Sequence, residues 1–177
     1  MAQKFKVKWS SRAIITTVIF NAAALILIIM YAAGLLTPEK NPSGWISYAI
    51  IAVVIHLPYL LHPTAYIITE DKLLIVRPIK NTAISLSEID FLRENRFADF
   101  NLKWRMLGSG GVWGFWGYFS GDHFNKINVQ ACDLEHLVFI ATTEHRFYLL
   151  SPKDRDQFMN AMVSRMDKIG KVPQVVG

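Results

Sequence analysis

The sequence has a single cysteine, Cys132, and few charged residues. One cysteine cannot form a disulfide within the chain and cannot build a cysteine-based zinc site. Asp, Glu, Lys and Arg make up 19% of the 177 residues, against about 25% in soluble domains, whereas 52% are apolar. The composition therefore leans toward a membrane protein, and the lone cysteine fits a reducing compartment.

Motifs for catalysis and nucleotide binding are also missing. The glycine-rich residues 108–111 neither follow a clear strand nor open a helix, and no Gly-Lys-Ser/Thr is present, which argues against a phosphate-binding loop. No serine or cysteine has a nucleophile motif around it, and the five histidines do not suggest three or four convergent metal ligands. We therefore expect no enzymatic activity, no catalytic residue, no cofactor and no metal.

The net charge of +5 is concentrated at the N-terminus. Residues 1–12 contain four basic side chains and no acid: Lys4, Lys6, Lys8 and Arg12. Residues 37–44 are neutral, and the rest of the chain has 14 basic and 13 acidic side chains, giving +1. A nucleic-acid-binding domain would need a basic face on the folded domain itself, so we expect no nucleic-acid partner.

Two apolar segments follow the basic N-terminus. Residues 13–36 contain no charged side chain and, at about 1.5 Å per residue, form a helix longer than the roughly 30 Å hydrocarbon core of a bilayer. The alternatives are a buried helix of a soluble protein and a cleaved signal peptide, but the run is too long for a typical signal core. A polar turn at 37–44 leads to a second apolar segment at 45–61. We expect a hairpin of two transmembrane helices.

The charge of the loops predicts how this hairpin is oriented. The basic residues 1–12 should stay in the cytoplasm, and two crossings return the chain there. We therefore expect a two-pass protein of the inner (cytoplasmic) membrane with both termini cytoplasmic. Asn21 and His56 are the strongly polar side chains within the spans, and we expect them to hydrogen-bond across the hairpin. A lone histidine offers no proton relay.

Short segments of β-type composition, separated by polar turns, fill the chain from residue 64 to residue 150. The predicted strands are 65–69, 72–76, 82–86, 88–95, 125–131, 136–142 and 146–150. In the fourth strand we expect Ile89 and Phe91 on one face and Asp90 on the other. Many short strands with brief turns are typical of an antiparallel sheet that is closed or packed on itself.

The sequence changes to a helical period after residue 150. Ser151 is a good N-cap, and Pro152 suits the first helical position. The predicted helix has an apolar face that must cover an apolar surface. That face carries Phe158, Met162 and Met166. Gly170 ends the helix, and we expect residues 171–177 to form a frayed tail.

This order of about seven strands and one final amphipathic helix resembles the bacterial pleckstrin-homology-like (PH-like) domain families. The resemblance rests on residues 66–76 (YIITEDKLLIV), 84–92 (ISLSEIDFL) and 146–162 (RFYLLSPKDRDQFMNAM). It implies a partly open antiparallel β-barrel that the C-terminal helix caps. Many members also carry two membrane helices just before the domain. The implied organisation is a basic N-terminus with a membrane hairpin at 1–63 and a PH-like domain at 64–170.

The stretch GSGGVWGFWGYFSG, residues 108–121, holds six of the ten glycines and five aromatic side chains. Three interpretations stay open: a core strand bent by glycine, a membrane-facing loop, or a protein interface. Along an extended strand Trp113 and Trp116 would point to opposite sides, so one should face outward. Lys103 and Arg105 flank the stretch and could meet lipid phosphates. The candidate binding residues are Lys103, Arg105, Trp113, Phe115, Trp116 and Tyr118.

Together these features predict a non-enzymatic integral membrane protein that displays a cytoplasmic PH-like domain. The domain would recognise the membrane surface or a protein partner, with self-association. The expected partners are membrane lipid and a protein or a second copy of the chain. The alternative is a structural or assembly subunit of a membrane complex, in which the domain is a scaffold. The resemblance concerns the fold, and a fold does not determine a function.

Overall fold

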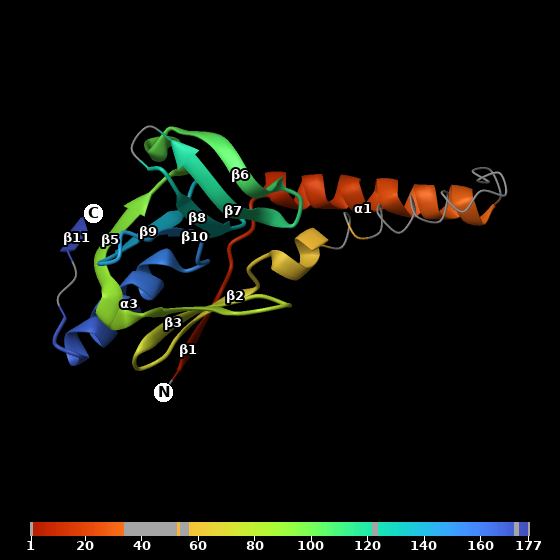
Figure 1. Cartoon of the computed structure of the whole chain (residues 1–177). Helices are drawn as coiled ribbons and strands as arrows, with labels where there is room; N and C mark the ends of the chain where they lie inside the picture. Colours follow the sequence, from red (N-terminus) through yellow and green to blue (C-terminus); the bar gives the residue numbers. More distant parts are fainter. Residues whose placement is uncertain (1, 34–52, 54–56, 122–123, 172–173, 177) are drawn as a thin grey trace.

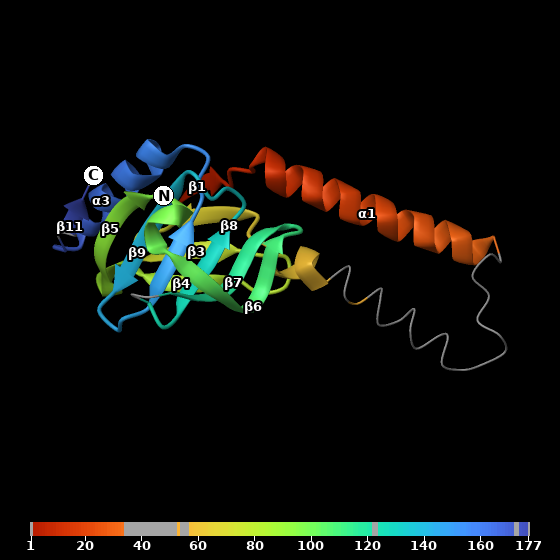
Figure 2. The same ribbon diagram turned by 90° about the horizontal axis from the view of Figure 1, so that it is seen from above.

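The computed structural model describes residues 2–33, 53, 57–121, 124–171 and 174–176; the side chains at 31–32, 102–105 and 174–176 lie outside that description. Figure 1 shows a mainly-β domain from which one long helix, α1 (Ser11–Ala32), extends to one side. Figure 2 shows the same arrangement from above, with the C-terminal helix α3 (Arg155–Lys168) lying against the domain at the end away from α1.

The first sheet has four antiparallel strands in the order β1-β2-β3-β4. The strands are β1 (Gln3–Lys6), β2 (Ala65–Ile68), β3 (Lys72–Val76) and β4 (Thr82–Ser85). A short 3-10 turn, η1 (Leu86–Glu88), follows β4. The last three strands confirm the first three predicted strands, whereas β1 was not predicted because it comes from the basic N-terminus.

The second sheet has seven strands in the order β11-β5-β9-β10-β8-β7-β6. They are β5 (Ile89–Asn95), β6 (Leu102–Gly111), β7 (Gly114–Gly121), β8 (Ile127–Ala131), β9 (Leu137–Thr142), β10 (Phe147–Leu150) and β11 (Gln174–Val176), with the 3-10 turn η2 (Phe97–Phe100) between β5 and β6. β7 and the end of β6 agree with the strand interpretation, one of the three left open for residues 108–121. The rest of β6 was not predicted, nor was β11, which lies in the expected frayed tail.

The expectation of a purely antiparallel sheet was wrong. The hairpin of β9 and β10 folds back so that β10 lies between β9 and β8, and β10 therefore runs parallel to β8. β11 also pairs in parallel with β5. The strands form two sheets, and no pairing among the described strands closes them into a barrel.

The basic N-terminus connects the two sheets. After β1 has paired with β2, the backbone N–H of Lys8 donates to Ser151 O (2.7 Å), just beyond β10. The backbone N–H of Ser10 donates to Cys132 O (2.9 Å), just beyond β8. The residues before α1 are therefore part of the folded domain and not a separate basic segment ahead of it.

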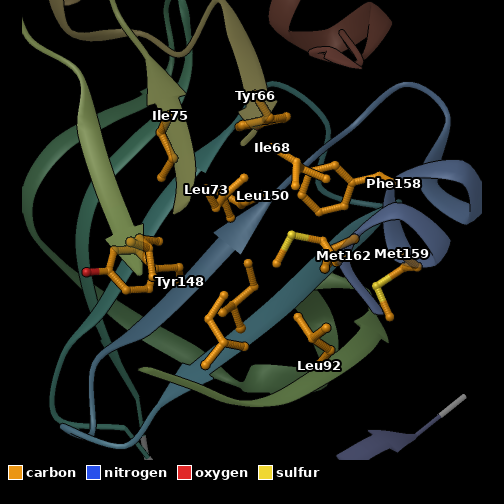
Figure 3. Packing of buried hydrophobic residues seen from close by; sticks show 14 of the residues in the cluster. Tyr66, Ile68, Leu73, Ile75, Leu92, Tyr148, Leu150, Phe158, Met159 and Met162 are labelled. Atoms are coloured by element: carbon orange, nitrogen blue, oxygen red, sulfur yellow. The ribbon is translucent and has the colours of Figure 1, made fainter. Parts of the chain in front are cut away.

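The main apolar core lies between the two sheets and α3. Figure 3 shows Phe158 and Met162 of α3 pointing toward Tyr66 and Leu150 of the sheets. Phe158, Met162 and Met166 are fully buried, which confirms the predicted apolar face of the helix. A second apolar cluster lies on the other face of the seven-stranded sheet, so that sheet is buried on both faces.

The predicted start of the C-terminal helix was wrong. The N-cap of α3 is Asp154, and Ser151 and Pro152 lie in an extended segment before it. Ser151 is fully buried, and its Oγ accepts a hydrogen bond from the backbone N–H of Cys132 (2.8 Å). Pro152 forms a bridge with Val7. These tertiary contacts hold the chain extended and override the local preference for a helix.

The expected shared face of Ile89 and Phe91 was also wrong. A β-bulge interrupts the pairing of β5 with β9 between these two residues. A bulge adds one residue to a strand and so breaks the two-residue alternation of side chains. Ile89 consequently lies in the main core, whereas Phe91 packs against the second cluster.

The helix α1 supports the first predicted membrane span. Residues Ser11–Met30 form the one described helix that is long and apolar enough to cross a membrane. Most of its large apolar side chains are exposed, among them Val18 at 60% and Leu25 at 57%. A soluble core helix would bury these side chains, so a bilayer is a suitable environment for them.

The second predicted span, 45–61, lies mostly outside the described residues. Residues 53 and 57–61 are described, and they are helical. His62 follows directly and is buried where the chain enters the domain. The hairpin of two membrane helices therefore stays a prediction.

Candidate functional site

The glycine–aromatic stretch forms most of a two-stranded hairpin whose tip lies beside α1. Strands β6 and β7 pair antiparallel along their lengths, and the chain reverses at Val112 and Trp113. Figure 1 shows this tip on the side of the domain from which α1 leaves. The hairpin tip therefore lies at the junction between the domain and the expected membrane segments.

The spacing of the glycines is explained by cross-strand pairing. Gly111 lies opposite Gly114, and Gly108 lies opposite Gly117. At Gly108, φ is +137°, and a Cβ atom there would overlap the carbonyl oxygen of Trp116. A Cβ at Gly117 (φ +119°) would overlap the backbone of the partner strand in the same way. The two strands approach so closely that only glycine fits at this pair.

A hydrogen bond joins the tip of the hairpin to α1. The backbone N–H of Trp113 donates to Oγ1 of Thr17 (2.8 Å), and that hydroxyl donates to Ala13 O within the helix (2.7 Å). Thr17 is buried, with 8% of its surface exposed, and Gly111 lies against the side chain of Thr16. The second turn of α1 is thus held against the hairpin.

Aromatic side chains fill the space between the hairpin tip and the helical residues 57–61. The ring of Trp113 packs edge-on against Tyr59, with 4.9 Å between ring centroids, and lies 5.6 Å from the ring of His62. Trp9, just before α1, completes the group at 6.0 Å from His62. We call these four residues the junction cluster. They come from three separate segments of the chain.

His62 lies at the centre of the junction cluster with 6% of its surface exposed. Burial lowers the pKa of His62, although its hydrogen bond with the backbone oxygen of Tyr59 acts in the opposite direction. The lowered pKa favours the neutral imidazole, whose Nδ1–H donates to the Tyr59 carbonyl. The neutral imidazole packs against the rings of Trp9, Tyr59 and Trp113 and helps to fix their orientation.

The structure separates the predicted binding residues into different environments. Trp113 lies in the turn with φ +55°, so the expected strand alternation of Trp113 and Trp116 does not apply. Phe115 is buried in the second apolar cluster. Trp116 is half-buried, and its Nε1 has no hydrogen-bond partner among the described residues. Tyr118 is half-buried, and the Lys126 ammonium lies 4.1 Å from its ring centroid.

The remaining predicted residues are only partly described. The backbone of Lys103 and Arg105 belongs to β6, but their side chains are outside the described part of the structure. Nδ2 of Asn21 donates to Thr17 O within α1 (2.7 Å). His56 lies outside the described residues, as does any bond between it and Asn21. The binding and helix-contact roles of these residues stay predictions.

Several residues of this junction were not predicted from the sequence. Thr17, Tyr59 and His62 were not among the candidates, because their roles depend on the hairpin folding back onto α1. Trp9 was also missed, although it ends an alternating basic and apolar run. Within the residues that the structure describes, no group of three His, Cys, Asp or Glu side chains could hold a metal ion.

Comparison with known proteins identifies the family of the domain. The bacterial PH domain family matches the chain at residues 64–166. No curated protein and no solved structure matches the chain significantly. The matched region begins just after the junction cluster residue His62 and ends within α3.

Proposed function

Because the chain belongs to the bacterial PH domain family, whose domains are generally non-catalytic binding modules, we propose that it is a membrane-anchored recognition protein. Two membrane helices, at 13–36 and 45–61, hold the domain at 64–170 against the cytoplasmic face of the inner membrane. The domain recognises the membrane surface or a protein partner there. Its two sheets and its C-terminal helix pack around one apolar core.

The pairing of β1 with β2 is the observation that supports this topology most strongly. Gln3–Lys6 lies before α1 in the chain, and Ala65–Ile68 lies after both expected spans, yet the two strands pair in one sheet. Residues on both sides of the membrane segments therefore lie on the same side of the bilayer. If α1 crosses the membrane, the chain must cross back before residue 65, and the apolar segment 45–61 is suited to that return.

The N-terminal charge supports a cytoplasmic position for the domain. Residues 1–12 carry +4 with no acidic residue, and basic residues next to the first span are retained in the cytoplasm. Since this segment contains a strand of the domain, its orientation determines that of the whole domain. The junction cluster then lies at headgroup depth, where Trp and Tyr are favoured.

A test of membrane integration uses the full-length chain in its cells. We expect the protein to stay in the membrane pellet after an alkaline carbonate wash, because two apolar helices cross the bilayer. Release into the supernatant, as for a peripheral protein, would contradict the proposal. A matched variant with Leu25→Arg and Ile26→Arg in α1 should lose membrane retention, since charged residues at mid-membrane depth oppose insertion.

Protein assembly is the second candidate function, and the outer strand of the hairpin favours it. β6 is the last strand of its sheet, and Met106 and Leu107 on it are 61% and 71% exposed. An exposed apolar edge strand can pair with a strand from another chain. In detergent-purified full-length protein, Leu107→Lys should shift sedimentation toward the monomer. Unchanged sedimentation of an oligomer would exclude this edge as the contact.

A further inference from the structure

The turn between β3 and β4, residues 77–81, lies beside the end of the second expected membrane span. The backbone N–H of Ile79 donates to the carbonyl oxygen of Leu60, at 3.2 Å. Leu60 belongs to the helical residues 57–61, which lead from the membrane segment into the domain. Figure 1 shows this turn, in yellow-green, extending toward the same side as α1.

The turn exposes an apolar side chain between basic ones. Ile79 is 58% exposed, Lys80 is exposed, and Arg77 is half-buried. The turn contains no acidic residue, and no carboxylate of the described residues forms an ion pair with Arg77 or Lys80. Apolar side chains flanked by basic ones are typical of segments that lie in the headgroup region of a membrane.

The structure also fixes the shape of the turn. Nε of Arg77 donates to Lys80 O at 2.8 Å, and its Nη2 donates to Oγ1 of Thr82 at 2.7 Å. The backbone N–H of Arg77 donates to Oδ1 of Asn81 at 3.2 Å. Through these bonds the Arg77 guanidinium holds the turn in one conformation, with Ile79 exposed. The turn should therefore lose little conformational entropy when it binds.

We propose that residues 77–81 form a second membrane contact, in which Ile79 enters the headgroup region and Lys80 binds the phosphates of anionic phospholipids. Arg77 supplies a further positive charge and braces the turn. The inference rests on the proposed function, because the depth of the turn follows from the end of the span at residue 61. The turn binds the bilayer that surrounds the chain's own helices. Lipid phosphates of that bilayer lie at the level of Leu60.

Single-cysteine labelling measures this contact in the full-length chain. Cys132 is fully buried and burial raises the pKa of its thiol, so it should resist a maleimide dye. Ile79→Cys, labelled with a polarity-sensitive dye, is reconstituted into vesicles of phosphatidylcholine alone or mixed with phosphatidylglycerol. Asp71→Cys, in the turn at the opposite end of β3, is the matched control, and Leu25→Cys in α1 reports insertion.

The expected result is a blue-shifted emission at position 79, larger in the vesicles that contain phosphatidylglycerol, and an aqueous spectrum at position 71. Adding Lys80→Glu should remove the difference between the two lipid compositions. An aqueous spectrum at 79 with a lipid-like spectrum at 25 would overturn this inference and leave the proposed function intact.

Two other outcomes also contradict the proposal. A blue-shifted emission at position 79 that persists in detergent and increases with protein concentration would show that the turn contacts a second copy of the chain. An aqueous spectrum at position 25 would instead contradict the proposed function, since α1 would then not be in the bilayer.

Discussion

The backbone N–H of Trp113 donates a hydrogen bond to the hydroxyl of Thr17, at 2.8 Å, across 96 positions of the sequence. Thr17 lies in the second turn of α1, and Trp113 lies in the turn of the glycine-rich hairpin. This bond, together with the packing of Trp113 on Tyr59 and His62, joins the hairpin of the domain to α1 and to the helical residues 57–61. The domain is therefore held in one orientation relative to α1.

The first prediction concerns a substitution that removes the acceptor of this bond. Thr17→Val keeps the shape of the side chain but leaves the Trp113 N–H without this partner. We therefore expect the free energy of unfolding to fall by about 1–3 kcal/mol. Hydrogen exchange at the Trp113 amide should become faster. The control is Thr16→Val, because Oγ1 of Thr16 donates to Arg12 O in its own helix. Equal exchange in both variants would show that the bond does not hold the tip.

The second prediction concerns the glycine pair of the hairpin. In Gly108→Ala the new Cβ overlaps the Trp116 carbonyl in a left-handed backbone, so the destabilisation should exceed about 3 kcal/mol. Gly170→Ala is the control, since its φ is +73° but no atom lies within 4 Å of the added Cβ. That change should cost about 1–2 kcal/mol. Denaturant unfolding measures the free energy of unfolding of both variants. An equal decrease in the two would contradict the close approach of β6 and β7 at Gly108.

The third prediction tests the packing of α3. Phe158 is fully buried, and its ring contacts Phe5 of β1 and Tyr66 of β2 edge-on. Phe158→Ala should lower the free energy of unfolding by about 3–5 kcal/mol. The exposed neighbour Gln157→Ala should change it by less than about 0.5 kcal/mol. A melting temperature unchanged by Phe158→Ala would place the helix elsewhere than on the sheets.

The fourth prediction concerns pH. Because burial lowers the pKa of His62 below its ordinary 6.5, the folded state binds fewer protons than the unfolded state in the window just below pH 6.5. The stability from the neutral ring is complete above pH 6.5 and is lost as the pH falls toward the lowered pKa. Thermal unfolding between about pH 5 and pH 8 measures it. His62→Gln should flatten this dependence, whereas the exposed His145→Asn should keep it.

Much of the domain was predictable from local patterns. The strands from residue 65 to residue 95 and from 127 to 150 follow runs of aliphatic and β-branched residues between polar turns, and these runs were recognised. The buried face of α3 follows from the spacing of Phe158, Met162 and Met166. In both cases the signal lies within a few consecutive residues.

The features that were missed depend on distant contacts or on competing signals. Phe5 and Val7 alternate with lysines, which is a strand pattern, but the net charge of this segment also fits a basic stretch ahead of a membrane span. The hairpin of β6 and β7 is rich in glycine, which strands usually avoid, and its pairing becomes evident only when Gly108 meets Gly117. Ser151 resembles a helix cap locally, but a partner far along the chain engages it.

We propose that β1 and the rest of the domain lie together on the cytoplasmic side, with two membrane crossings between β1 and β2. Labelling of intact cells with a membrane-impermeant maleimide tests it most directly, using full-length variants with one added cysteine each. Asn41→Cys, in the predicted turn between the spans, should react from outside, whereas Lys4→Cys and Lys153→Cys should react only after permeabilisation. Labelling of position 4 or 153 in intact cells, or of position 41 only after permeabilisation, would contradict the account.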